Sequence, residues 1–201
     1  TTALIIVDVQ NDFCTGGSLC VNDNEMIFPL IQKLRSNPKF DFVFEQEIGT
    51  HQTISHFKPT IPVVSCFKQS SSKRPVLSRL CGPFTAFKAH TVLSSTVNAI
   101  KDGEIVINKG TLVEVDSYSG FGSAPEVTSL AKLAFRGVKT VYCVGLAYDY
   151  CVGSTAIDAA KLGIDTYIVV DATKSVSPAS EEKMKLRCDA AGVKEVRSQD
   201  I

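Results

Sequence analysis

The sequence has no surplus of charge of either sign. Lysine plus arginine and aspartate plus glutamate each number 21, so the formal net charge is zero, and no basic run exceeds two residues. Proteins that attract nucleic acid or anionic membranes carry clustered positive charge. We therefore expect neither of these partners, and the composition favours a small-molecule substrate or ligand.

Long apolar runs are also missing. The longest stretches, near residues 3–7 and 168–170, are far shorter than the roughly 20 residues that span a bilayer. The first residues lack the charged region and the following apolar segment of a secretory signal. We expect a soluble, cytoplasmic protein, with secretion as the open alternative.

Cysteine, by contrast, is plentiful. The chain has seven cysteines, at positions 14, 20, 66, 81, 143, 151 and 188. Bridges between Cys14 and Cys20 or between Cys66 and Cys81 are conceivable, but a chain of 201 residues buries a sufficient core without them. Reduced thiols are the favoured prediction, and a disulfide framework is the alternative.

Apolar β-branched runs alternate with helical patterns along the chain. Strands are expected near residues 3–7, 40–44, 63–67, 104–108, 141–146, 165–170 and 193–197, and helices near 26–34, 91–100, 125–136, 151–160 and 178–191. This alternation is typical of a three-layer α/β fold with a doubly wound, mainly parallel sheet, here in a single domain over residues 1–201. Residues 45–89 are the least regular part, and we expect a lid or binding segment there.

One cysteine, Cys151, lies where chemistry is expected. The apolar run at residues 141–146 passes through a short polar turn into a helix of small residues, and Cys151 begins that helix. Unpaired backbone N–H groups and the helix dipole at such a position favour a thiolate, which suits a nucleophile. The alternative is a small hydrophobic residue of the core.

Asp8 and Lys109 occupy equivalent places after two other predicted strands. The carboxyl ends of parallel strands meet at one edge of a sheet, so both side chains should lie near Cys151. Lysine would stabilise a thiolate, and aspartate would take the thiol proton and later pass it to a leaving amine. The backbone N–H groups of Ala147 and Cys151 would hold the oxyanion formed from a small amide or similar acyl substrate.

Three motifs, in this order, carry a resemblance to a known family. They are residues 8–13 (DVQNDF) with 16–19 (GGSL), residues 108–110 (NKG) with 116–121 (DSYSGF), and residues 145–152 (GLAYDYCV) with 155–156 (TA). Together they resemble the nicotinamidase branch of the isochorismatase-like cysteine hydrolases over nearly the whole chain. Family members deamidate nicotinamide to nicotinate and ammonia through a thioester, and sister enzymes act on other carbamoyl, amide or vinyl-ether substrates.

The resemblance implies a role for each reactive residue. Asp8 would be the proton shuttle, Lys109 would support the thiolate, and Cys151 would be the nucleophile. The peptide between Leu146 and Ala147 would be cis, as at the corresponding point of the family, to aim the oxyanion hole. The family also leaves a homo-oligomer open.

Three aromatic residues are candidates for the walls of the substrate pocket. They are Phe13, Tyr118 and Phe121, all within the motifs quoted above. Pocket walls are themselves largely apolar, so a place in the hydrophobic core is the alternative for each.

The chain departs from the family at its divalent-metal site. The family carries Asp-Trp-His-Pro with a further histidine, and later Trp-Pro-x-His-Cys, where this chain has QEIGT at 46–50, Thr53, and GPFTA at 82–86. Tryptophan is absent from the chain, and Gly82 replaces the tryptophan that packs on the pyridine ring. Glycine offers no ligand and threonine a poor one, so the usual site cannot form and no metal cofactor is expected.

The histidines leave one alternative open. The chain has only three, His51, His56 and His90, and all lie in the two segments that carry the family's metal ligands. With Glu47 they would form a shifted metal site, although their spacing matches no standard pattern.

Two functions follow from these observations. The first is a metal-independent amidohydrolase of nicotinamidase type with an altered substrate, in which Asp8, Lys109 and Cys151 act together. The second is a non-catalytic family member, a pseudoenzyme, that uses the remodelled pocket to bind a small ligand or a protein partner. The retained triad favours the enzyme, although a nucleophile can also persist as a relic.

Overall fold

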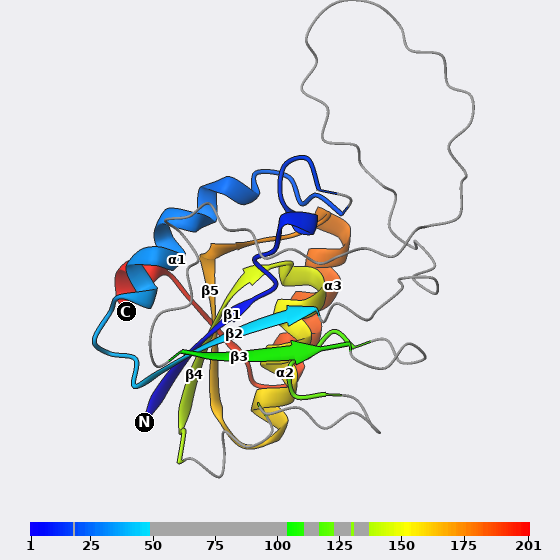
Figure 1. The fold of residues 1–201 in the computed structure, drawn as a ribbon. Helices are drawn as coiled ribbons and strands as arrows, with labels where there is room; N and C mark the ends of the chain where they lie inside the picture. The colour runs from blue at the N-terminus through cyan, green and yellow to red at the C-terminus, as the bar shows by residue number, and fades with distance from the viewer. Residues whose placement is uncertain (18, 49–103, 111–116, 123–129, 131–136) are drawn as a thin grey trace, which may run out of the picture.

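A computed structural model describes residues 1–17, 19–48, 104–110, 117–122, 130 and 137–201. In this part of the chain six parallel strands form one sheet in the order β3-β2-β1-β4-β5-β6 (Figure 1). The strands are β1 (Thr2–Val7), β2 (Phe42–Ile48), β3 (Ile105–Lys109), β4 (Thr140–Leu146), β5 (Asp165–Lys174) and β6 (Lys194–Val196). This arrangement confirms the predicted doubly wound α/β fold.

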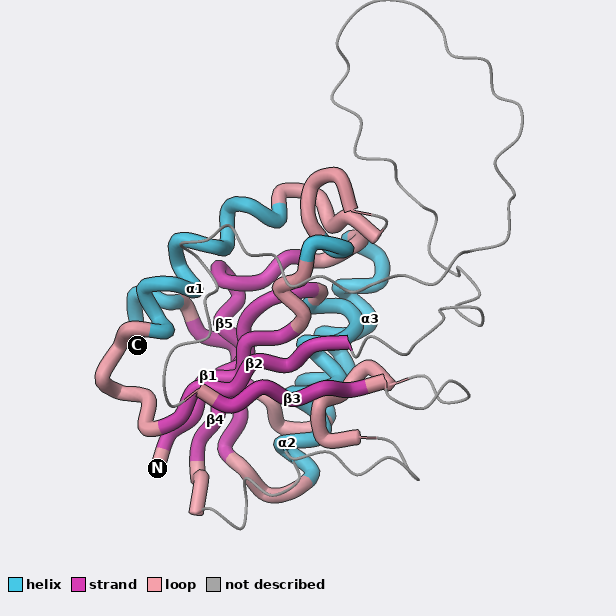
Figure 2. The backbone as a smooth tube through the Cα atoms, in the orientation of Figure 1, coloured by secondary structure: helices cyan, strands magenta, loops and turns pink. Residues whose placement is uncertain are grey.

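Helices cover both faces of the sheet. Figure 2 shows α1 (Phe28–Arg35) on one side and α2 (Gly153–Lys161) with α3 (Pro178–Ala190) on the other. Short 3₁₀ helices occur at η1 (Asn11–Phe13), η2 (Asn24–Ile27) and η6 (Ser198–Asp200), and a π-helical turn, η5 (Tyr148–Val152), leads into α2. The sheet is therefore the middle of three layers.

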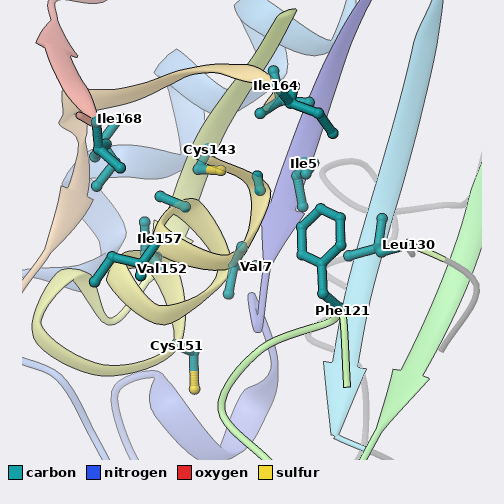
Figure 3. Close-up of a cluster of buried hydrophobic side chains, with 14 of the residues drawn as sticks. Ile5, Val7, Phe121, Leu130, Cys143, Cys151, Val152, Ile157, Ile164 and Ile168 are labelled. Atoms are coloured by element: carbon teal, nitrogen blue, oxygen red, sulfur yellow. The ribbon is translucent and has the colours of Figure 1, made fainter. Parts of the chain in front are cut away.

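The side chains of β1 alternate between two hydrophobic clusters. Ala3, Ile5 and Val7 belong to the cluster beneath α2 and α3, which Figure 3 shows from within. Leu4 and Ile6 belong to the cluster beneath α1. Because both faces of the strand are buried, its sequence is continuously apolar, as is typical of a central parallel strand.

The predicted strand at 40–44 is displaced in the structure. Strand β2 begins at Phe42 and continues through Glu45 and Gln46 to Ile48. These polar residues stay in the strand because both are paired: Glu45 lies 3.0 Å from Arg35 of α1, and the side chain of Gln46 accepts a hydrogen bond. Burial of polar groups is tolerated when they are satisfied in this way.

Several other predicted elements lie outside the described residues. These are the strand at 63–67, the helix at 91–100, most of the helix at 125–136, and nearly all of the irregular segment at 45–89. The cysteines within the described residues, which are Cys14, Cys20, Cys143, Cys151 and Cys188, are all free thiols, so Cys14 and Cys20 are not bridged. Cys66 and Cys81 lie outside this part.

No helix in the described ranges has both the length and the apolar character required to cross a membrane.

Candidate active site

Three strand ends bring the predicted reactive residues to one edge of the sheet. Asp8 directly follows β1, Lys109 is the last residue of β3, and Cys151 lies in η5 after β4. Asp8 has a φ of 48°, a left-handed conformation that is uncommon for a residue other than glycine. Such backbone outliers cluster at functional sites, and this one directs the chain away from the sheet at the point where the acid lies.

The lysine ammonium joins the other two side chains. Lys109 Nζ lies 2.9 Å from Asp8 Oδ2 and donates to Cys151 Sγ at 3.3 Å and to the carbonyl oxygen of Ser117 at 3.2 Å. The side chains of Asp8 and Lys109 are both 0% exposed. The sequence placed these three residues at one edge, and the structure brings them into direct contact.

Burial and charge shift the pKa of each group. Burial raises the pKa of Asp8, although the Lys109 ammonium opposes that shift. Burial acts to lower the pKa of Lys109, but the charges of Asp8 and Cys151 outweigh it and the net shift is upward. Lys109 is therefore a cation at neutral pH.

Opposing effects act on the pKa of the Cys151 thiol. Burial and then the charge of Asp8 raise it, against the lowering effect of Lys109. The helix start was expected to favour a thiolate, and desolvation and the neighbouring carboxylate act in the opposite direction. A thiol that retains its proton needs a base at the moment of attack, and Asp8 is beside it.

The turn that carries Cys151 has the backbone form that the motif implied. The peptide between Leu146 and Ala147 is cis, as expected. The N–H groups of Tyr150 and Val152 both donate to the carbonyl oxygen of Ala147 at 3.1 Å, so the turn is π-helical and the α-helix begins only at Gly153. The N–H groups of Ala147 and Cys151 lie on this turn, and their role as an oxyanion hole stays a prediction.

A buried glutamine on β2 ties the site together, and our sequence analysis did not identify it. The N–H of Asp8 donates to the carbonyl oxygen of Gln46 at 2.9 Å, and Thr155 Oγ1 of α2 donates to Gln46 Oε1 at 2.9 Å. Gln46 thus connects the strand end at Asp8 with the helix that follows Cys151. Gln46 lies beyond the predicted strand at 40–44, so the sequence offered no signal that it is buried in β2.

The three predicted pocket walls are divided between the two hydrophobic clusters. Tyr118 packs with the cluster beneath α2 and α3, and its ring centroid lies 6.0 Å from that of Tyr150, next to the nucleophile. Phe121 is buried in the same cluster beside Leu130 (Figure 3). Phe13 packs against the cluster beneath α1. Tyr118 therefore adjoins the turn that carries Cys151, and Tyr150 is an aromatic neighbour that we did not predict. Phe121 lies in the same cluster as Cys151, and the role of all three residues as pocket walls stays a prediction.

The predicted alternative metal ligands are only partly described. Glu47 lies on β2 opposite Asn108 of β3, whereas His51, His56 and His90 lie outside the described residues. Among the described residues no group of three histidine, cysteine, aspartate or glutamate side chains is placed to hold a metal. A metal needs several donors at fixed distances, so the described residues do not fit one, and no step below is assigned to a metal.

A cavity borders the same turn through Tyr148. It has a volume of about 620 Å³, and its lining includes Lys185 and Glu195 but none of Asp8, Lys109 and Cys151. Tyr148 Oη donates to Glu195 Oε1 at 2.8 Å. The side chain of Tyr148 is therefore directed toward β6 and α3.

Comparison with known proteins places these observations in a family context. Residues 2–200 match the family described as the isochorismatase domain. A nicotinamidase from Acinetobacter baylyi is 33% identical over 213 residues, which cover 99% of this chain and 94% of that protein.

Solved structures give the same result. A nicotinamidase/pyrazinamidase from Acinetobacter baumanii superposes with a TM-score of 0.75 at 30% identity, covering 99% of this chain and 97% of that one. A pyrazinamidase from Pyrococcus horikoshii, solved in complex with zinc, superposes with a TM-score of 0.72 at 31% identity, covering 98% of each chain.

Proposed function

The chain belongs to the isochorismatase domain family, and from this premise we propose that it is a nicotinamidase-like cysteine hydrolase that cleaves a small amide through a thioester on Cys151. One observation carries the proposal: Lys109 Nζ lies between Asp8 Oδ2 and Cys151 Sγ, at 2.9 and 3.3 Å. A buried acid, a cation and a thiol in mutual contact form the set of groups that nucleophilic cleavage of an amide requires.

The first half of the reaction forms the thioester. Cys151 Sγ attacks the amide carbonyl carbon while Asp8 takes the thiol proton, and the carbonyl electron pair moves to the oxygen. The N–H groups of Ala147 and Cys151 stabilise this oxyanion. When the carbon–oxygen double bond re-forms, the carbon–nitrogen bond breaks, Asp8 returns its proton to the leaving nitrogen, and ammonia departs.

The second half releases the acid. Water attacks the thioester carbon, Asp8 takes a proton from that water, and the sulfur leaves and recovers the proton as a thiol. Lys109 remains a cation throughout and stabilises each anionic state of the sulfur. The balance is one amide and one water converted to one carboxylic acid and ammonia.

We propose that this reaction does not use a metal. The residues at the family's ligand positions include Gly49 and Thr53, which cannot replace histidine, and the chain has no tryptophan to stack on a pyridine ring. Nicotinamide should therefore bind weakly, and a smaller or differently shaped amide is the expected substrate. The zinc complex of the Pyrococcus relative makes zinc the metal to test.

Ammonia release tests the proposal. The purified protein would be given nicotinamide, pyrazinamide and a panel of small aliphatic amides and carbamoyl compounds, with Cys151→Ala as the matched control. We expect release from at least one compound and none from the variant. No turnover of any compound by the folded protein would favour the non-catalytic binding protein.

A further inference from the structure

An acid that takes no part in the proposed chemistry is buried two residues before the nucleophile. Asp149 lies in η5 and is 4% exposed. Its Oδ1 accepts the N–H of Val176 at 3.0 Å, and its Oδ2 accepts the N–H of Ser177 at 3.2 Å and the hydroxyl of Ser180 at 2.5 Å. These partners belong to a segment 27–31 residues further along the chain.

The segment that Asp149 binds is the start of α3. Ser177 caps this helix, its hydroxyl oxygen accepting the N–H of Ser180, and Pro178 is the first helical residue. The unpaired N–H groups and the positive end of the dipole at a helix start favour an anion. The Asp149 carboxyl group is therefore held by a second element, and it fixes η5 to α3.

A second contact joins the same two elements. A Cβ atom on Gly153, directly after η5, would lie 2.5 Å from the sulfur of Met184 in α3. Gly153 thus contacts the Met184 side chain closely, and a larger residue would have to displace it. The turn is thus packed against α3 at Gly153 and hydrogen-bonded to it at Asp149.

We propose that Asp149 is a positioning residue of the nucleophile turn. This inference rests on the proposed function. The proposed oxyanion donors, at Ala147 and Cys151, lie two residues on either side of Asp149, and the thiol is part of the same five-residue turn. Fixing the turn to α3 therefore holds the sulfur near Asp8 and Lys109 and holds both N–H groups in one orientation.

The test is Asp149→Asn. Asparagine keeps the volume but replaces one carboxylate oxygen with an N–H₂ group, which faces backbone N–H donors that it cannot pair with. On the best amide of the panel we expect kcat to fall about 10- to 100-fold with KM within about threefold, because small misplacements at a reacting centre have effects of this size. Ser180→Ala removes one of the bonds and should give a smaller loss in the same direction.

The matched control is Asp171→Asn. Asp171 accepts the N–H and the hydroxyl of Ser198 at 2.8 and 2.6 Å, so it makes similar bonds but holds η6 at the end of the chain. The Asp171→Asn substitution should leave kcat unchanged. A kcat of Asp149→Asn within twofold of the wild-type value would overturn the inference.

A measurement without turnover separates this inference from the proposed function. The pH profile of Cys151 alkylation by iodoacetamide, resolved by peptide mass spectrometry, depends on the contacts of the thiol with Asp8 and Lys109. We expect the profile to move in Asp149→Asn and to coincide with wild type in Asp171→Asn. If no amide is hydrolysed but the profile moves, the proposed function fails and the positioning role stands; if the Asp149→Asn and wild-type profiles coincide, the positioning role fails.

Discussion

Asp8, Lys109 and Cys151 form a cluster in which each group makes the burial of another tolerable. An isolated ion in a dry interior is costly, and a buried pair persists when geometry and hydrogen bonds compensate. Here the ammonium contacts a carboxylate at 2.9 Å, a sulfur at 3.3 Å and a carbonyl oxygen at 3.2 Å. The same contacts bring together the groups to which we assign the roles of base and nucleophile.

Replacing Asp8 with asparagine should have opposite effects on hydrolysis and on thiol reactivity. Hydrolysis loses its proton acceptor, so kcat should fall about 100-fold or more. The negative charge of Asp8 raises the pKa of Cys151, and its removal should lower that pKa, so more thiolate is present at pH 8. Iodoacetamide should then alkylate Cys151 faster than in the wild-type protein. Slower alkylation would show that Asp8 is not what keeps the thiol protonated.

Replacing Lys109 with methionine should reveal its part in stability. The substitution leaves the Asp8 carboxylate buried without its cation, so the free energy of unfolding should fall by about 3–5 kcal/mol. The double variant Asp8→Asn with Lys109→Met has no charge at either of these positions and should recover most of this loss while remaining inactive. Urea unfolding at pH 7 compares both variants with the wild-type protein. A Lys109→Met protein as stable as wild type would contradict the buried ion pair.

At the scale of elements, apolar strands were predicted well and polar contacts were not. The bounds of the predicted strands at 3–7 and 141–146 agree with those of β1 and β4 to within one residue. An unbroken apolar run of this length is typical of a parallel strand that is buried on both faces. The polar end of β2 depends on partners distant in sequence. Gln46 pairs with Thr155 across 109 residues, and no local pattern encodes such a bond.

Beneath α1, a second buried cluster joins α1, β2 and the start of β3. Arg35 of α1 forms ion pairs with Glu45, at 3.0 Å, and with Glu104. Burial raises the pKa of Glu45 from 4.5 to about 7, Arg35 opposes the shift, and the charges of Glu104 and Glu47 add to it. Glu45 and Glu104 thus share the Arg35 guanidinium, and the folded protein favours the protonated form of Glu45.

This cluster predicts a pH dependence of stability. Between pH 4.5 and 7 the folded protein binds more protons at Glu45 than the unfolded chain does, so the free energy of unfolding falls as pH rises. Glu45→Gln should remove this contribution. From pH 5 to pH 8, the free energy of unfolding should therefore fall by about 1–3 kcal/mol less in the variant than in the wild-type protein. Urea unfolding at both pH values measures it. Glu182→Gln, at an exposed position of α3, is the control for loss of one charge, and equal pH dependence in both variants would contradict the prediction.

For the whole molecule, the order of the strands decides how the triad meets. Lys109 ends β3, and β2 and β1 separate that strand from β4. Its long side chain therefore reaches across the edge of the sheet to Asp8, next to β1, and to Cys151, beyond β4. The sequence predicted the shared edge, because parallel strand ends converge there, but strand order follows from pairing of the whole chain. The motifs covered enough of the chain to identify the family, whereas Gly49 and Thr53, at two of the family's metal-ligand positions, lie outside the described residues.

The sequence leaves two forms of the active site open, one without a metal and one with a shifted metal site. The metal content of the protein distinguishes them. We expect the purified protein to lack stoichiometric zinc and to keep its kcat after treatment with EDTA, because Gly49 and Thr53 stand where the family has histidine ligands. Elemental analysis and the ammonia assay measure these two properties. One mole of zinc per chain, lost in Glu47→Gln and in alanine variants of His51, His56 and His90, would instead establish the shifted site. The Asp149→Asn and Asp171→Asn variants should match wild type in metal content in either case, since neither residue belongs to that set of ligands.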